Sequence, residues 1–264
     1  RVTGVQTCAL PILGFLPFEQ ENEKPSFIKM LDIPNFVGAV IAAVLWVISK
    51  FCVPQFKLYV PPNDSLSNFP KKVGKDLVPF NPMITGIIIS QFLLVFLVYF
   101  LSKKFPKILK EFNPFTAFYI GIIIFSFNNF ATNIIKGYVG RARPDLYGHC
   151  GENSNHLTCN KKEEFRSWPS GHSSASMSGT LYPCLFLQKV VKTRNSIWII
   201  VCCMLPIISL YVGGSRIRDF RHHPDDVLAG LFLGAFITFI FWIRTYKTIF
   251  LKKINDISNS QFEA

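Results

Sequence analysis

The sequence predicts an all-α, polytopic membrane protein built as a bundle of six transmembrane helices. Half of the 264 residues are hydrophobic, 27 are phenylalanine and the mean hydropathy is positive, a composition too apolar for an ordinary soluble domain of this length. Six apolar runs reach or approach the ~20 residues needed to cross a hydrocarbon core. They lack the strict alternation of barrel strands, and several carry Gly or Ser in mid-segment, so helices are expected.

The expected spans follow one another at residues 36–53, 83–101, 115–135, 174–191, 197–212 and 227–243. The fourth run gives the weakest signal of the six. The sequence thus predicts one membrane domain over residues 36–246, preceded by an N-terminal segment, 1–35, and followed by a polar cytoplasmic tail, 247–264. The stretch at 1–12, RVTGVQTCALPI, lacks an initiator methionine and looks like read-through from a sequencing adaptor, so it is expected to be non-native and to play no part in the fold.

The net charge of +12 is concentrated in the connections between the expected spans. Basic residues cluster after the second, fourth and sixth spans: Lys103, Lys104, Lys107 and Lys110; Lys189, Lys192 and Arg194; and Arg244, Lys247, Lys252 and Lys253. Because cytoplasmic segments of membrane proteins are enriched in Lys and Arg, these three segments are predicted to be cytoplasmic. The connections after the first, third and fifth spans then face the lumen or the exterior. This distribution explains the charge without a nucleic acid partner, and none is expected.

Two features of the outward connections agree with that orientation. Asn63 begins an Asn-Asp-Ser glycosylation sequon in the connection after the first span. Cys150 and Cys159 bracket a short polar segment in the third connection, where a disulfide would require an oxidising compartment. His149 and His156 beside them raise the alternative of a zinc site. Their order with the cysteines matches no common zinc module, so no metal is expected.

Polar residues gather in three clusters of the outward connections. The segment KGYVGRARP (136–144) leaves the third span, WPSGHSS (168–174) enters the fourth, and GGSRIRDFRHHPDDVLAG (213–230) joins the fifth to the sixth. Each cluster alone has an ordinary structural explanation: cations that snorkel at a helix end, a turn that caps the next helix, and histidines in a solvated loop. All three are predicted at one membrane face, however, and together they supply what phosphoryl transfer requires.

A phosphate ester needs fixed cations and backbone donors around it, because its transition state spreads negative charge over the equatorial oxygens. Lys136, Arg143 and Arg216 are the candidate cations. Ser170 and Gly171 lie at a turn that opens a helix, where hydroxyl and N–H donors and the helix dipole favour an anion. These five residues are the expected phosphate-binding site.

Histidine is suited to act as nucleophile and as acid, because its pKa lies near neutrality. His222 stands four residues before Asp226, with Pro224 in the first turn of the expected helix, so the two side chains share a helix face. Asp226 would then hold one ring nitrogen of His222 and leave the other free to attack phosphorus. His172 would protonate the departing alkoxide and then activate water. His223, three residues from Asp226, is the second candidate for the nucleophile.

Other residues near these clusters are given no catalytic role. Charged residues at the rim of the same mouth are expected to be solvated: Arg141, Arg218, Asp219, Arg221 and Asp225. Asparagines on the third span are expected to bond between helices: Asn128, Asn129 and Asn133. Gly230 and Gly234 on the sixth span form a small-xxx-small pair, which predicts close helix packing.

In order and spacing, the three clusters resemble the three-part signature of the type 2 phosphatidic acid phosphatase family. The matching residues are Lys136 with Arg143 and Pro144, then Pro169 to His172, then Ser215 and Arg216 with His222 and Asp226. No signature position departs from the family pattern. The segments VGRARPD and RHHPDDVLAG are similar to the lipid phosphate phosphatase and diacylglycerol pyrophosphate phosphatase-like branch, and the resemblance covers roughly residues 36–246.

The resemblance implies a metal-independent hydrolase with no cofactor and with its active site on the lumenal or extracellular side. Phosphate binding would fall to Lys136, Arg143, Ser170, Gly171 and Arg216. His222 would form a phosphohistidine, Asp226 would orient it, and His172 would act as the acid.

A site at the bilayer surface suits a headgroup on a lipid anchor, so the expected substrate is an anionic phospholipid: phosphatidic acid, lysophosphatidic acid or diacylglycerol pyrophosphate. Polyisoprenyl pyrophosphate and sphingoid base phosphate, which proteins with the same signature hydrolyse, are the alternative substrates. A catalytically silent lipid-binding protein and a transporter are alternatives of other classes. The retained histidines and cations argue against the first, and charges confined to one face argue against the second. The sequence indicates neither an oligomeric state nor an organelle.

Overall fold

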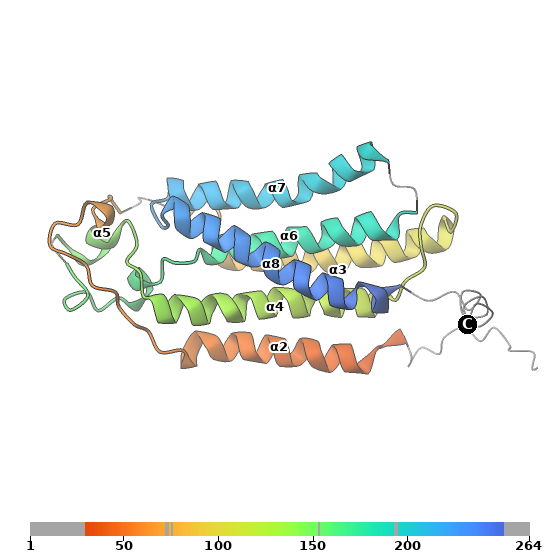
Figure 1. The fold of residues 1–264 in the computed structure, drawn as a ribbon, viewed down its shortest axis with the longest axis horizontal. Coiled ribbons are helices and arrows are strands. Elements are labelled where there is room, and N and C mark those ends of the chain that lie inside the picture. The colour runs from red at the N-terminus through yellow and green to blue at the C-terminus, as the bar shows by residue number, and fades with distance from the viewer. Residues whose placement is uncertain (1–29, 72–73, 75, 153, 193–194, 251–264) are drawn as a thin grey trace, which may run out of the picture.

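The computed structural model describes residues 30–71, 74, 76–152, 154–192 and 195–250, and in this part of the chain six helices of 20 residues or more form a bundle (Figure 1). They are α2 (Ile33–Cys52), α3 (Phe80–Lys104), α4 (Pro114–Val139), α6 (Gly171–Val190), α7 (Ser196–Arg218) and α8 (Pro224–Ile249). The connections contain the short elements η1 (Ser65–Ser67), α5 (Leu146–Cys150) and η2 (Lys162–Phe165). The described residues hold no β-strand beyond isolated bridges, so the predicted all-α class is confirmed.

Local sequence explains where several of these helices begin and end. The Asn113 side chain accepts hydrogen bonds from two backbone N–H groups at the start of α4, and the Ser170 hydroxyl accepts one such bond at the start of α6. Pro224 occupies the first position of α8, where a missing N–H costs no hydrogen bond. The last residue of α4 is followed by Gly140, whose φ of 63° lies in the left-handed region that glycine adopts without strain.

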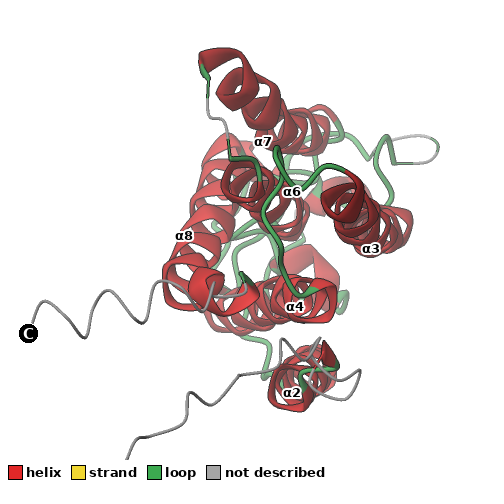
Figure 2. Ribbon diagram, turned by 90° about the vertical axis from the view of Figure 1, so that its right-hand side faces the viewer, coloured by secondary structure: helices red, strands yellow, loops and turns green. Residues whose placement is uncertain are grey.

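Five of the long helices, α2, α3, α4, α7 and α8, are long and apolar enough to cross a membrane, and each overlaps one predicted span. The predicted span at 174–191 coincides with α6, which is not among these five, so six spans are not confirmed as such. Figure 2 shows the reason, because α6 lies in the middle of the bundle among α3, α4, α7 and α8. Most of its residues are buried against protein, and a helix shielded from lipid does not need an apolar surface.

Helix α8 packs closely on α6, which confirms the prediction from the small-xxx-small pair. A Cβ atom at Gly230 would lie 2.4 Å from the carbonyl oxygen of Ser170, and one at Gly234 would lie 2.4 Å from that of Ser174. Real Cβ atoms do not approach backbone so closely, so only glycine permits this contact. The packing sets the first turns of α8 against the start of α6.

The helix directions place the three polar clusters at one end of the bundle. Helices α2, α4 and α7 end there, α3, α6 and α8 begin there, and α5 lies beyond them (Figure 1). The connection 53–79 crosses this end and is bonded to α4: Phe56 N–H donates to the Gly137 carbonyl at 2.9 Å, and Leu58 N–H donates to the Gly140 carbonyl at 2.8 Å. The described parts of the basic segments lie at the opposite end.

Two predicted segments fall mainly outside the described residues. The N-terminal segment 1–35 is described only from residue 30, and the tail 247–264 only as far as residue 250. The expectation that residues 1–12 are non-native therefore lies outside the described residues.

Candidate active site

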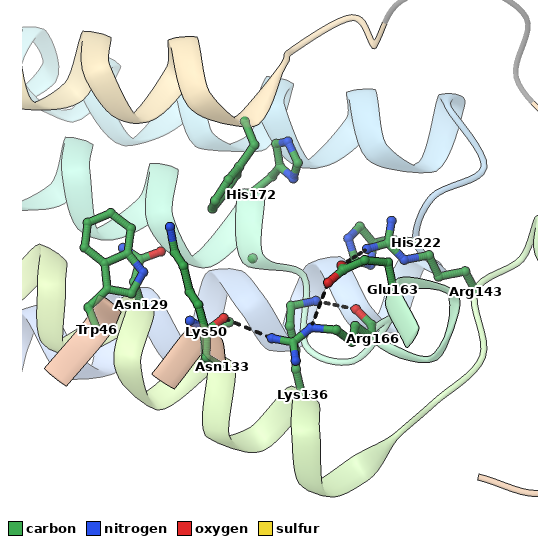
Figure 3. Close-up of a pocket in the computed structure, with 13 residues that line it drawn as sticks. Trp46, Lys50, Asn129, Asn133, Lys136, Arg143, Glu163, Arg166, His172 and His222 are labelled. Carbon is green, nitrogen blue, oxygen red and sulfur yellow. Dashed lines mark hydrogen bonds and ion pairs between the residues drawn. The ribbon is translucent and has the colours of Figure 1, made fainter. Parts of the chain in front are cut away.

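A cavity of about 330 Å³ lies at this end of the bundle, between α2, α3, α4, α6 and the connection before α8. Figure 3 shows the side chains that line it. Of the residues predicted to act on or bind phosphate, those in the cavity wall are Lys136, Arg143, Gly171, His172 and His222. The three clusters, which are far apart in the sequence, thus converge on one cavity.

His222 lies in the connection between α7 and α8, in front of a buried carboxylate. Its Nδ1 is 3.6 Å from Oδ2 of Asp226, so Nε2, on the far side of the ring, is the atom available to a ligand. The Asp226 carboxylate accepts hydrogen bonds from the Ser167 hydroxyl at 2.6 Å and from the His223 N–H at 2.8 Å. Arg141 donates to its other oxygen at 2.8 Å. Three donors therefore hold Asp226 in one orientation behind His222, and Arg141 is not the solvated rim residue that was expected.

Burial and nearby positive charge both act on the pKa of His222. Burial lowers the pKa of His222 well below 6.5, and the charges of Lys136 and Arg143 lower it further. The ring is therefore neutral at neutral pH. In this state one ring nitrogen carries the lone pair that a nucleophile needs.

Several buried polar atoms of the cavity residues have no hydrogen-bond partner in the described part of the chain. They include Nε2 of His172, Nδ1 of His222 and Nε of Arg143. Buried polar groups in native structures are nearly always satisfied. Since Nδ1 of His222 faces the Asp226 carboxylate at 3.6 Å, the buried atoms of these three residues that lack any polar partner among the described residues are Nε2 of His172 and Nε of Arg143.

The N-terminus of α6 brings Gly171 and His172 to the cavity. Phe80 of α3 packs edge-on against the His172 ring, with the ring centroids 4.8 Å apart. Ser170 does not line the cavity, because its hydroxyl accepts the N–H of Ser173 at 3.4 Å and its own N–H donates to the Asp226 carbonyl at 2.8 Å. Ser170 therefore caps α6 and joins it to α8, instead of presenting its hydroxyl to the cavity.

Lys136, in the last turn of α4, and Arg143, in the connection that follows, bring positive charge to the cavity. The Lys136 ammonium donates to the carbonyl oxygens of Arg166 and Ser167, at 2.5 and 3.4 Å. Nη2 of Arg143 lies 3.6 Å from the carboxylate of Glu163. Burial lowers the pKa of Arg143 to about 10, so its guanidinium remains charged at neutral pH.

Arg216, at the end of α7, does not line the cavity. Its guanidinium is buried and paired with Asp219 at 2.7 Å and with Asp76 at 3.3 Å. Asp219 is itself 1% exposed, so the expectation that it is solvated is wrong. The cause is the buried guanidinium, which needs a carboxylate beside it. Arg216 would have to exchange one of these partners to bind phosphate.

Arg221 was also expected to be solvated, but it is bound by acidic and histidine side chains. Its Nη1 lies 2.8 Å from Asp145, 3.3 Å from Glu164 and 3.0 Å from Nε2 of His149. Burial alone would lower the pKa of Arg221, but the two carboxylates raise it. The three partner side chains could together hold a metal ion. Since the guanidinium already lies between them, the cluster instead anchors the connection that carries His222.

The residues of the alternative zinc site are engaged separately. Cys150 and Cys159 are joined by a disulfide. His149 contacts Arg221, and the ring of His156 packs edge-on against Tyr59. These contacts give the four side chains no common ligand position.

His223, the second candidate nucleophile, lines a different cavity with Arg141 and Tyr59. It stands at the N-cap of α8, where its backbone N–H donates to the Asp226 carboxylate. The structure therefore favours His222 as the histidine that meets a ligand in the larger cavity.

Residues that carry no motif also line the cavity. They include Trp46, Lys50, Phe80, Asn133, Glu163 and Arg166. Asn133 bonds between helices as expected, since it donates to Ser49 of α2 at 2.9 Å, and it also accepts from Arg166 at 3.2 Å. The same expectation is wrong for Asn129, whose amide donates to the Phe125 carbonyl of its own helix at 2.8 Å. In the sequence, the one feature that could have pointed to Lys50 and Arg166 is their positive charge near the outward end of an expected span.

Comparison with known proteins assigns these residues to a family. The profile of the family described as the PAP2 superfamily matches residues 115–250, which is more than half of the chain and includes all three clusters. No solved structure matches the chain.

Three relatives illustrate the similarity. Diacylglycerol pyrophosphate phosphatase 1 of Saccharomyces cerevisiae is 31% identical over 140 residues, covering 46% of this chain and 48% of the relative. Phospholipid phosphatase 1 of Rattus norvegicus is 33% identical over 138 residues, with coverage of 46% and 48%. A PA-phosphatase related-family protein of Dictyostelium discoideum is 28% identical over 236 residues, covering 86% of this chain and 84% of the relative. The matches to the yeast and rat relatives thus span about half of their length.

Proposed function

Because this chain belongs to the PAP2 superfamily, we propose that it is an integral membrane phosphatase that hydrolyses the phosphomonoester of phosphatidic acid to diacylglycerol and phosphate. The observation that carries the proposal is the convergence of Lys136, Arg143, His172 and His222 on one cavity, with Asp226 behind His222. The names of relatives, a diacylglycerol pyrophosphate phosphatase and a phospholipid phosphatase, support a phosphorylated lipid as the substrate class. Lysophosphatidate and diacylglycerol pyrophosphate are related substrates of the same site.

In the first step, Nε2 of His222 attacks phosphorus. Lys136, Arg143 and the N-terminus of α6 at Gly171 hold the equatorial oxygens, and the Asp226 carboxylate stabilises the ring as it becomes positive. The bond from phosphorus to the lipid oxygen breaks, and its electron pair leaves with that oxygen, which takes a proton from His172. This step yields diacylglycerol and a phosphohistidine.

In the second step, His172 takes a proton from a water molecule, and the water oxygen attacks phosphorus. The bond between phosphorus and Nε2 breaks, which releases inorganic phosphate and restores neutral His222. The scheme uses no metal ion and no cofactor.

Two predicted phosphate ligands have indirect roles in this scheme. Ser170 positions the start of α6 through its cap and its bond to the Asp226 carbonyl. Arg216 reaches phosphate only by exchanging Asp76, which is the more exposed of its two partners.

We also propose that six helices cross the membrane, α6 included, and that the cavity faces the lumen or the exterior. The basic segments at the opposite end support this orientation. Asn63 lies in the connection 53–79, which is bonded to α4 beside the cavity, and the Cys150–Cys159 disulfide would need an oxidising compartment. A glycan that is present on the wild-type chain and lost in Asn63→Gln would mark this side.

Phosphate release from phosphatidic acid, measured with the purified chain in detergent and with a chelator present, tests the proposed activity. His222→Ala is expected to reduce kcat/KM by at least ~10³-fold, because it removes the nucleophile. His223→Asn is the matched control from the next position, since asparagine keeps an N-cap and the side chain lies outside the catalytic cavity. It is expected to stay within a few-fold of wild type. Equal rates for wild type and His222→Ala would exclude His222 as the nucleophile.

A further inference from the structure

The cavity carries more positive charge than one phosphate group requires. Its wall contains four cationic side chains: Lys50, Lys136, Arg143 and Arg166. Glu163 is the one carboxylate in this described wall, and it lies 3.6 Å from both Arg143 and Arg166. Lys136 and Arg143 belong to the phosphate site described above, which leaves two further cations to explain.

Lys50 and Arg166 differ in how many hydrogen-bond and ion-pair partners the protein gives them. Arg166 donates to Gln55 at 3.0 Å and to Asn133 at 3.2 Å, in addition to its contact with Glu163. Lys50 has no hydrogen-bond acceptor or carboxylate partner among the described residues; its ammonium lies 4.7 Å from the centroid of the Trp46 ring. Its charge is therefore the one in the cavity wall that the described part of the chain leaves available.

The position of Lys50 relative to the reacting histidines decides what it can bind. Figure 3 shows His222 and Arg143 on one side of His172, and Lys50 with Trp46 on the other side. The leaving group in phosphoryl transfer departs roughly opposite the nucleophile. The group attached to the attacked phosphorus therefore extends away from His222, past His172 and toward Lys50.

The chemistry of that leaving group differs between two classes of lipid. In a lipid monophosphate it is a neutral alcohol, which gives an ammonium little to bind. In a lipid diphosphate it is a second phosphate, which carries negative charge. A lysine at this place therefore favours the diphosphate.

We propose that Lys50 is a specificity-determining residue that binds the second, non-transferred phosphate of a lipid diphosphate, so that the cavity hydrolyses diphosphate lipids in preference to monophosphate lipids. This inference rests on the proposed phosphatase function. In the reaction, His222 bonds to the terminal phosphorus and the bond to the bridging oxygen breaks. The electron pair stays with that oxygen, on the lipid monophosphate that leaves; water then releases the terminal phosphate from His222.

The test compares substrates on the full chain in mixed micelles with a chelator present. The substrates are phosphatidic acid, diacylglycerol pyrophosphate and a polyisoprenyl diphosphate, and the variants are Lys50→Gln and Lys50→Arg. Lys104→Gln is the matched control: Lys104 also ends a helix, and its ammonium lies 5.6 Å from the Phe105 ring, but at the opposite end of the bundle. Thermal melting of each variant checks that it is folded.

Lys50→Gln is expected to lower kcat/KM about tenfold for a diphosphate lipid, since it removes one charge-assisted contact, and to change it less than about twofold for phosphatidic acid. Lys50→Arg is expected to keep most of the preference, and Lys104→Gln is expected to leave it unchanged. If Lys50→Gln lowers kcat/KM for one or both of the diphosphate lipids, the lipids affected are those whose second phosphate Lys50 binds.

An equal effect of Lys50→Gln on monophosphate and diphosphate lipids, or no effect on either, would overturn the proposal. So would a loss of the preference in Lys104→Gln. A wild-type chain that releases phosphate from none of the lipids would instead overturn the phosphatase function itself, and the role of Lys50 with it.

Discussion

His222 meets three conditions for a histidine nucleophile at one position. It is 3% exposed, its Nδ1 faces a carboxylate that three donors hold in place, and the side chains of Lys136 and Arg143 share its cavity. Burial and positive charge favour the neutral ring in the free protein, and in the proposed reaction Asp226 would favour the positive ring. The two effects act on different stages, so they do not oppose each other.

The pKa of His222 gives a direct prediction at this scale. Burial first, and the charges of Lys136 and Arg143 next, lower it well below 6.5. The ring should therefore stay neutral as the pH falls through 6.5 and take up a proton only at its own, lower pKa. In Arg143→Gln the midpoint should rise toward 6.5, because one repelling charge is lost. NMR titration of ring-labelled histidine, with the His222 signal assigned by its absence in His222→Gln, measures both values; a wild-type midpoint at or above 6.5 would refute this.

The motifs predicted some of the residues that line the cavity, but Ser170 and Arg216, which the motifs also mark, lie outside its wall. Lys136, Arg143, Gly171, His172 and His222 all line the cavity. Residues that act on those side chains without belonging to a motif were not predictable. Ser167 and Arg141 hold the Asp226 carboxylate, but the sequence predicted Arg141 only as a solvated residue at the same mouth and indicated no contact for Ser167.

At the scale of elements, α6 shows why a helix buried inside the bundle gives a weak hydropathy signal. Its first half reads GHSSASMSGT, and small polar residues of this kind give a low mean hydropathy. In the structure these side chains face other helices, where their hydroxyls bond to α6 carbonyls or, as in the 3.0 Å contact between Ser174 and Thr132, to α4. Hydropathy measures how favourably a segment transfers from water to lipid. It therefore gives a strong signal for the outer helices and a weak one for the central helix, whose side chains contact protein.

The contact between α8 and α6 predicts the effect of one substitution. Gly230→Ala would place a Cβ atom 2.4 Å from the Ser170 carbonyl oxygen, in a backbone segment that carries the start of α6. We expect a loss of about 1–3 kcal/mol in the free energy of unfolding, together with a fall in kcat, since Gly171 and His172 would move. Unfolding in detergent and phosphate release measure the two effects.

Gly214→Ala on α7 is the matched control for that substitution. A Cβ atom at Gly214 would meet nothing within 4 Å, so alanine should be neutral or stabilising by up to about 1 kcal/mol. Equal unfolding free energies for the two variants would show that the close approach at Gly230 does not constrain the bundle.

At the scale of the whole molecule, the cavity and the basic segments lie at opposite ends of the bundle. One end holds the cavity, the disulfide and the connection 53–79, and the other end holds the basic segments. Charge counting along the sequence was sufficient to predict this separation, because it depends only on which connection each charge belongs to.

The arrangement of the connections themselves was beyond prediction from the sequence. The cluster around Arg221 joins Asp145, which precedes α5, His149 of α5 and Glu164 of η2. Long connections with no periodic pattern give no signal for such contacts. These contacts nevertheless bear on the site, because Arg221 is the residue directly before His222.

The central claim is that His222 forms a covalent bond to phosphorus, and trapping that intermediate tests it most directly. The purified chain is quenched in alkali during turnover of radiolabelled phosphatidic acid, and the label on the protein is mapped by peptide analysis. We predict acid-labile label on His222 in the wild-type chain and in His223→Asn, and none in His222→Ala. Label that persists in His222→Ala, or a wild-type chain that turns over substrate without becoming labelled, would contradict the account.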